Sequence, residues 1–143
     1  AVEPELHKFA SFAFEDVCRE FVREMQKKNE LPFRYAKMGR WAGKTTVRDD
    51  SAASGLRIAE TEINLLCIDK DAKEYLVGEC KFKKTPFSYS EYLDTLAKLA
   101  PQKEHTKFHY ALFTESGFDE KIIAAAEKNN TLLYPLAYIV NYK

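Results

Sequence analysis

Cysteine is scarce in this sequence and long hydrophobic runs are missing, and each shortage excludes a class of protein. The three cysteines include no Cys-x-x-Cys pair, and their odd number argues against a disulfide framework, so a reducing compartment fits best. No apolar run approaches the roughly 20 residues of a membrane span. The N-terminal residues also lack the pattern of a secretory signal peptide. We therefore expect a cytoplasmic protein without a membrane partner.

An excess of charge of one sign is missing as well. The 22 lysines and arginines balance 22 aspartates and glutamates. The bulk charge therefore indicates neither a nucleic-acid nor a membrane partner, and any such surface must be local. The three histidines form no metal-binding pattern, and His109, inside a predicted strand, is interpreted as a structural residue.

Apolar material is present in sufficient amount for a core. The 143 residues are 45% hydrophobic and 13% aromatic, which is typical of a globular chain that needs no disulfide or structural metal. No internal repeat or linker is apparent, so we expect one domain over residues 1–143. The first residue is alanine rather than methionine, and we expect a domain excised from a longer protein.

Hydrophobic periodicity predicts the order helix, three strands, helix, strand, helix, strand. The first helix is indicated by apolar residues that recur every three or four positions between Leu6 and Met25. Period-two and β-branched patterns predict strands at 33–38, 60–69, 74–82, 107–114 and 131–140, with a long loop from Gly39 to about Glu60. This order indicates an α/β fold with a mixed central sheet flanked by helices. We expect an antiparallel meander and then a helical crossover to a further strand.

Local signals predict where the later helices begin and end. Ser88 and Glu91 have capping-box spacing, and Ser116 and Asp119 resemble a second capping box. Pro101 is expected to end the first of these two helices. Pro135 is expected to mark an edge or a bend in the last strand.

The stretch GRWAGKTT, residues 39–46, looks like a phosphate-binding loop but differs in spacing. That motif needs four residues between its first glycine and the Gly-Lys pair, and this chain has only three. No amphipathic helix follows to aim its N-terminus at a phosphate. We interpret the stretch as a surface loop in which Arg40, Trp41 and Lys44 are solvated or face a partner.

Opposite charges end the predicted strand YLVGECKFKK. Residues i and i+2 of a strand share a face, so Glu79 and Lys81 point the same way, about 7 Å apart, while Cys80 faces the core. The preceding strand offers Glu62 and Asn64 on one face. Because the two strands are predicted hairpin neighbours, we expect these four polar side chains on one face of the sheet.

In the same strand, Ile63 and Leu65 are expected on the other, apolar face. Carboxylates, an amide oxygen and a backbone carbonyl are ligands that Mg²⁺ accepts, and a nearby lysine can stabilise charge developing on phosphorus. An exposed cross-strand salt bridge, worth under about 1 kcal/mol, is the simpler interpretation of the charged pair alone.

The element order together with Glu79-Cys80-Lys81 resembles the PD-(D/E)xK nuclease superfamily. That resemblance implies a restriction-endonuclease-like αβββαβ core and metal-dependent phosphodiester hydrolysis. Many members carry a glutamate on the first helix, and Glu15 matches that position. By this resemblance Glu79, Lys81 and Glu15 would be catalytic. Glu79, the Cys80 carbonyl, Asn64 and Glu62 would hold Mg²⁺ or Mn²⁺.

The motifs MGRWAGK, ETEINLL, LVGECKF and ALFTESGFDEKI together resemble, more narrowly, a prokaryotic family of unknown function. Its members lie C-terminal to the ATPase domain of archaeal-type AAA/STAND ATPases. The resemblance runs from about Phe9 to Leu136 and implies an upstream ATPase domain as a partner in the same polypeptide. One residue departs from the pattern, because Asn64 stands where the family has aspartate, and the lost charge should weaken metal binding.

Three classes of function remain open from the sequence. The first is a nuclease-fold domain whose phosphodiesterase is weakened or inactive, with an active Mg²⁺-dependent DNA endonuclease as its alternative. The second is a non-catalytic module that binds nucleic acid or a protein partner. The third is an oligomerising domain, with FSYSEY, residues 87–92, as its exposed aromatic patch. For the second class, the phosphate-binding candidates are Lys81, Lys83, Lys84 and Arg40, with Lys98, Lys103 and Lys107 as further lysines.

Overall fold

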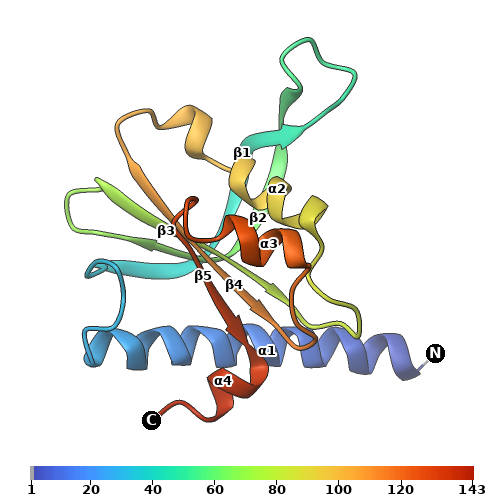
Figure 1. Ribbon diagram of the computed structural model, residues 1–143, viewed down its shortest axis with the longest axis vertical. Coiled ribbons are helices and arrows are strands. Elements are labelled where there is room, and N and C mark those ends of the chain that lie inside the picture. Colours follow the sequence, from blue (N-terminus) through green and yellow to red (C-terminus); the bar gives the residue numbers. More distant parts are fainter. Residues whose placement is uncertain (1) are drawn as a thin grey trace.

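The computed structural model describes residues 2–143, with side chains at residues 10–101 and 103–143. Figure 1 shows its elements, which follow the predicted order. They are α1 (Val2–Lys27), β1 (Lys37–Arg48), β2 (Leu56–Ile68), β3 (Glu74–Lys81), α2 (Tyr89–Ala97), the 3₁₀ helix η1 (Ala100–Gln102), β4 (Lys107–Thr114), α3 (Glu120–Ala125), β5 (Thr131–Pro135) and α4 (Leu136–Val140). No helix within residues 2–143 combines the length and apolar character that a membrane crossing requires.

The five strands form one mixed sheet in the order β1-β2-β3-β4-β5. The pairs β1–β2 and β2–β3 are antiparallel, whereas β3–β4 and β4–β5 are parallel. The predicted mixed α/β fold is therefore confirmed, including the antiparallel meander and the helical crossover, which α2 provides between β3 and β4.

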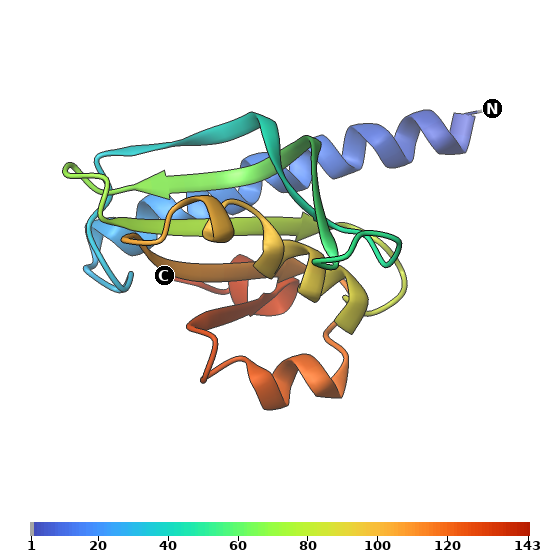
Figure 2. The same cartoon turned by 90° about the horizontal axis from the view of Figure 1, so that it is seen from above.

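Helices cover both faces of this sheet, and each face has its own core. Figure 2 shows α1 on one side and α3 on the other. The α1 face buries Phe14, Cys18 and Phe21 against Cys67 and Phe113. The opposite face carries two smaller clusters, one beneath α2 and α3 and one beneath the turn that follows α2. Burial of these side chains supplies most of the folding free energy, at about 25 cal/mol per Å² of apolar surface.

The segment from Gly39 to Glu60, predicted as a loop, is instead a long antiparallel ladder of β1 and β2. The turn at its tip is irregular, where Gly55 has a φ of +77° and Asp49 accepts a hydrogen bond from the Ser51 amide, and the pairing shifts once more between Gly39 and Trp41. The loop was predicted from the glycine, serine and aspartate content of this segment, but Gly43 serves the packing of a strand. A Cβ at Gly43 would lie 2.9 Å from Trp41 Cζ2, so the indole lies over a position without a side chain.

Helix starts were predicted with mixed success. The capping box of α2 is confirmed, because Ser88 and Glu91 exchange both bonds. The second capping box is wrong, since Asp119 alone caps α3, while Ser116 Oγ donates to the Lys83 carbonyl, 2.5 Å away. The last predicted strand ends at Pro135, where the chain turns into α4.

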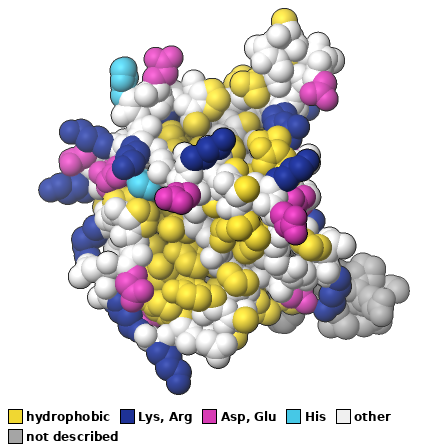
Figure 3. Space-filling model, viewed as in Figure 1, with side chains coloured by type: hydrophobic (Ala, Val, Ile, Leu, Met, Phe, Trp, Pro, Cys, Tyr) yellow, Lys and Arg dark blue, Asp and Glu magenta, His cyan; other side chains and the backbone are white. Residues whose placement is uncertain are grey.

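The predicted aromatic patch is not exposed. Phe87 and Tyr92 are fully buried and pack with Leu112 and Ile122. Tyr92 is directed to this cluster by α2, and Phe87, which precedes the helix, forms a β-bridge with Phe118. Exposed apolar side chains instead gather near β5, as Figure 3 shows. They include Ile123, Tyr138 and Val140.

Candidate functional site

The strands β2 and β3 separate at the predicted charged pair. Pairing of β2 with β3 ends at Leu65 and Gly78, whereas β3 continues to pair with β4 as far as Lys81. The strands approach closely at this fork, since a Cβ at Gly78 would lie 3.2 Å from the Leu65 carbonyl oxygen. Glu79 and Lys81 therefore lie beyond the last β2 partner, on a stretch of β3 that faces α2.

A β-bulge in β2 changes which side chains face this fork. Along β1, pairing moves from Gly39 to Trp41 while the β2 partner moves from Leu66 to Ile63, so β2 carries one extra residue here. As a result Ile63 packs in the cluster under the α2 side and Leu65 in the cluster under α1. The expectation that these two share a face is wrong, because the bulge reverses the alternation.

Asn64 lies in this bulge and bridges the fork. Its Oδ1 accepts a hydrogen bond from the Cys80 amide at 2.9 Å, and its carbonyl accepts one from Arg19 Nη1 at 3.3 Å. The amide oxygen predicted as a metal ligand therefore has a protein donor on it. The Cys80 thiol packs on the α1 side next to Cys18, so only the Cys80 carbonyl could serve as the predicted ligand.

Glu79 is buried and bound to Lys98, the residue that follows α2 as its C-cap. Its side chain is 7% exposed, and Oε1 accepts from Lys98 Nζ at 2.5 Å. The same ammonium donates to the Glu62 carbonyl oxygen at 2.6 Å. Burial raises the pKa of Glu79 above its ordinary value, although the positive charges of Lys98 and Lys81 act against the shift.

Lys98 was predicted only as one of several surface lysines, and its role at Glu79 was missed. The sequence carried one usable signal. Glu91, Thr95 and Lys98 are spaced by four and three residues, which is typical of one face of a helix, although α2 ends at Ala97 and Lys98 is its extended C-cap. That face lies over Glu79 and Lys81, but only the tertiary fold brings Lys98 to Glu79.

Lys81 is held more loosely than Lys98. Its Nζ lies 3.6 Å from Glu91 Oε2, and its side chain is 36% exposed. Glu91 also accepts a hydrogen bond from Lys83 Nζ at 2.7 Å. Burial alone would raise the pKa of Glu91, but the bonds from Lys83 and Ser88 outweigh it and lower that pKa to about 2.

Glu15 and Glu62 meet at Arg40, in a network separate from Lys98. Arg40 Nη2 contacts Glu62 Oε2 at 2.5 Å, and Arg40 Nη1 lies 3.8 Å from Glu15 Oε1. Arg19 lies 3.8 Å from the same Glu15 oxygen. The Glu62 carboxylate is therefore directed to Arg40, and only the Glu62 backbone carbonyl reaches Lys98.

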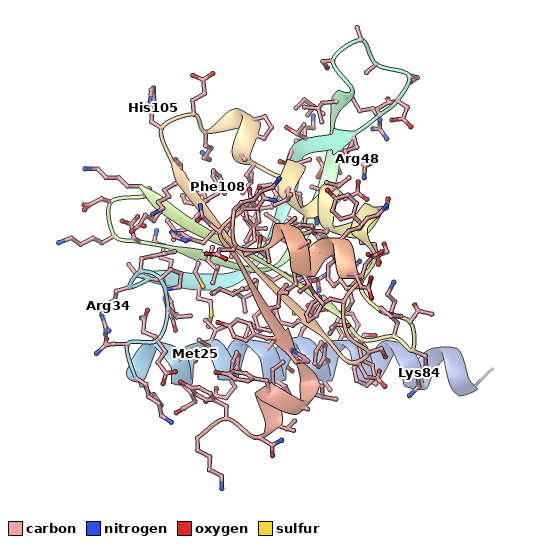
Figure 4. All side chains as sticks on the ribbon, viewed as in Figure 1. Met25, Arg34, Arg48, Lys84, His105 and Phe108 are labelled. Atoms are coloured by element: carbon pink, nitrogen blue, oxygen red, sulfur yellow. The ribbon has the colours of Figure 1, made fainter. Side chains whose placement is uncertain are left out.

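The predicted phosphate-binding side chains each have a carboxylate partner, and Lys81 and Lys83 share Glu91. Lys83 binds Glu91, Lys84 binds Glu115 at 2.9 Å, and Arg40 binds Glu62. Figure 4 shows Lys84, in the loop after β3, well away from Arg48 at the end of β1. Their predicted contact with nucleic acid stays a prediction.

A cleft of about 390 Å³ lies between α2 and the β1–β2 ladder, and we call it the charged cleft. Arg48 ties its rim to α2, with Nη1 3.2 Å from Asp94 Oδ1. Positive and negative side chains balance in its lining. The charged residues that line it are Arg48, Arg57, Lys81, Lys98, Glu60, Glu79, Glu91 and Asp94.

The residues as arranged do not fit a divalent cation. Within residues 10–101 and 103–143, no three side chains of histidine, cysteine, aspartate or glutamate converge on one point. Glu79 is the one predicted carboxylate ligand that faces the charged cleft, and the Lys98 ammonium lies between it and the Glu62 carbonyl. A hard dication prefers several oxygen ligands, and here an ammonium takes two of them.

This chain is similar to two proteins whose descriptions name no activity. The chain is 29% identical over 82 residues to the uncharacterized protein MJECL04 of Methanocaldococcus jannaschii, a match that covers 57% of this chain and 15% of the relative. Its fold is similar to the crystal structure of a protein of unknown function, AF1548, with a TM-score of 0.47 and 16% identity over 85% of this chain and 59% of the other.

A family model also matches residues 1–95, which is more than half of the chain. The family is described as archaea bacterial proteins of unknown function. By that match, this chain belongs to the DUF234 family.

Proposed function

We propose that this chain is a nuclease-like accessory domain in which metal-dependent phosphodiester cleavage is weakened or lost. The observation that carries the proposal is the Lys98 ammonium, bound to Glu79 Oε1 at 2.5 Å and to the Glu62 carbonyl at 2.6 Å. These oxygens lie at the fork where the sequence resemblance places a catalytic metal. In this proposal Lys98 fills the cation position that a metal would take in an active relative.

Electrostatics supports the proposal that Lys98 occupies the cation position where β2 and β3 separate. Two unit charges 4 Å apart interact by about 4 kcal/mol at an effective dielectric near 20. An incoming dication would have to displace Lys98, whose side chain is only 14% exposed, and leave a buried ammonium without its carboxylate. Asn64 adds no negative charge that would favour the exchange.

The parent protein is the second part of the proposal. The matched segment covers only 15% of the relative from Methanocaldococcus jannaschii, which is therefore far longer than this segment. That ratio supports a domain within a longer polypeptide. We propose an upstream ATPase domain as its covalent partner, on the strength of the sequence resemblance, with binding of nucleic acid or of that partner as the present role.

A cleavage assay separates this proposal from an active endonuclease. We would incubate the protein with single-stranded, duplex and branched DNA and with RNA, in Mg²⁺ and in Mn²⁺. The variants are Lys81→Ala, Lys98→Met with Asn64→Asp, and Lys128→Met as an exposed control in the turn after α3. We expect no metal-dependent cleavage by the wild-type chain. Cleavage that disappears in Lys81→Ala and persists in Lys128→Met would establish the active nuclease instead.

A further inference from the structure

A second pocket, of about 360 Å³, lies beside the turn that follows α2, and we call it the Trp41 pocket. Its volume falls in the range of about 300–1,000 Å³ that is typical of ligand sites. Two aromatic rings, two lysines and apolar side chains line it, and none of its described lining residues is acidic. The lining includes Trp41, Tyr75, Lys44, Lys103, Leu66 and Leu99.

Trp41 gives this pocket a fixed aromatic surface. Its indole lies over Gly43, where a Cβ would come within 2.9 Å of Cζ2. The ring also packs on the cluster that contains Ile63, Leu66 and Tyr75. It is partly exposed while these neighbours are buried, so one side of the ring rests on the core and part of it is open to a ligand.

The two lysines of the pocket are available to an anion. Lys103 Nζ lies 5.9 Å from the Tyr75 ring centroid, and Lys44 is exposed. Neither has a carboxylate partner among the side chains that the structure describes. In the charged cleft, by contrast, Lys81 and Lys98 each contact a carboxylate.

Backbone strain marks the wall between this pocket and the charged cleft. Leu99 has a φ of 60° and a ψ of −40°, a conformation that non-glycine residues rarely adopt. Its amide donates to Thr45 Oγ1 at 2.7 Å in a buried bond, which holds the turn. Such strain costs on the order of 1–3 kcal/mol, persists only where the surroundings enforce it, and is concentrated at ligand and switch sites.

We propose that the Trp41 pocket binds a nucleotide unit, with the base stacked on Trp41 and a phosphate held by Lys44 and Lys103. A flat aromatic surface beside two lysines that contact no described carboxylate suits a ligand that is both planar and anionic. Stacking of a base on an aromatic side chain contributes about 1–3 kcal/mol. Residues 39–46 lie in β1, so Trp41 and Lys44 would bind the ligand from a β-strand. The interpretation of these residues as a phosphate-binding loop therefore stays excluded. The nucleotide unit comes either from a free mononucleotide or from a single strand.

The single tryptophan makes this testable. Because Trp41 is the only tryptophan of the chain, its fluorescence reports on this pocket alone. The full chain would be titrated with AMP, adenosine, inorganic phosphate and a short oligothymidylate. We expect quenching by AMP or by the oligothymidylate, with weaker binding of adenosine and of phosphate because each supplies half of the contacts. Stronger binding of AMP would identify a free nucleotide, and stronger binding of the oligothymidylate a single strand.

Substitutions of Lys44, Lys103 and Trp41 test whether these residues contact the nucleotide unit. Lys44→Ala with Lys103→Ala should weaken the binding at least about tenfold, the size expected for a lost charged hydrogen bond. Lys128→Ala should bind as the wild-type chain does. Trp41→Phe, followed by calorimetry, should retain weakened binding. No quenching by either nucleotide probe, or equal affinity in the double lysine variant, would overturn the proposal. The assay contains no metal ion, so it is independent of the proposed function of the charged cleft.

Discussion

Two adjacent pockets use positive charge in opposite ways. In the charged cleft, Lys81 and Lys98 contact Glu91 and Glu79. In the Trp41 pocket, two lysines lie beside aromatic rings and contact no carboxylate within the described side chains. The neighbours Lys98 and Leu99 belong to different pockets, so one strained turn shapes both. The contrast teaches that a charged motif in a sequence identifies a site only once its internal partners are known.

The largest expected effect comes from breaking the buried pair of the charged cleft. Glu79→Leu leaves the Lys98 ammonium buried without its carboxylate, which should lower the free energy of unfolding by about 3–5 kcal/mol. Adding Lys98→Met to Glu79→Leu should restore most of that loss, because the uncompensated charge is gone. Urea denaturation measures both. Equal stability of the single and double variants would show that the pair is not coupled.

Metal affinity is the next largest effect and bears on the same cleft. Asn64→Asp should strengthen Mn²⁺ binding, and Asn64→Asp with Lys98→Met should strengthen it further, by about tenfold or more, since removing one competing charge is worth over about 1.4 kcal/mol. Isothermal titration calorimetry measures the affinities. The control Lys128→Met should leave the affinity unchanged. Equal affinity of wild type and Asn64→Asp would mean that this position is no ligand.

A smaller effect is expected from a substitution at Gly43, which tests how Trp41 is packed. Gly43→Ala places a methyl group 2.9 Å from Trp41 Cζ2, whereas Gly39→Ala meets no atom within 4 Å. We expect Gly43→Ala to displace the indole toward solvent, shift its emission to longer wavelength and cost about 1 kcal/mol. Gly39→Ala is the matched control in the same strand. Identical emission spectra for the two variants would contradict the packing of Trp41 on Gly43.

The smallest effect is a dependence on pH at Glu91. Because its folded pKa is lowered from 4.5 to about 2, Glu91 stabilises the fold above pH 4.5, and this contribution is lost as the pH falls toward 2. The stability difference between wild type and Glu91→Gln should therefore shrink across that window. Chemical denaturation at several pH values measures it, with Glu127→Gln as the exposed control. A constant difference would rule out this linkage.

Local signals in the sequence were enough to predict the order of the elements and the Glu79–Lys81 pair of the candidate site. The capping box at Ser88 and the Glu79–Lys81 pair are set by residues close in the chain. The Lys98 contact was not predictable in this way, because it joins residues 19 positions apart through the packing of α2. The β2 bulge at Asn64 was missed for a similar reason, since only pairing with β1 shows the extra residue. Residues 39–48 were predicted wrongly as a loop, partly because Gly43 suggested a loop, whereas this glycine makes room for Trp41 within a strand.

NMR of Glu79 and Lys98 while Mg²⁺ is added tests most directly whether Lys98 occupies the cation position at Glu79. We expect the protons of the Lys98 ammonium to be protected from exchange with water. We expect the chemical shift of the Glu79 side-chain carboxyl carbon to change in Lys98→Met. Neither signal should shift at millimolar Mg²⁺. A rapidly exchanging Lys98 ammonium, together with a Glu79 signal that moves with Mg²⁺, would contradict this expectation. That result would show that Mg²⁺, and not Lys98, binds Glu79 at the point where β2 and β3 separate.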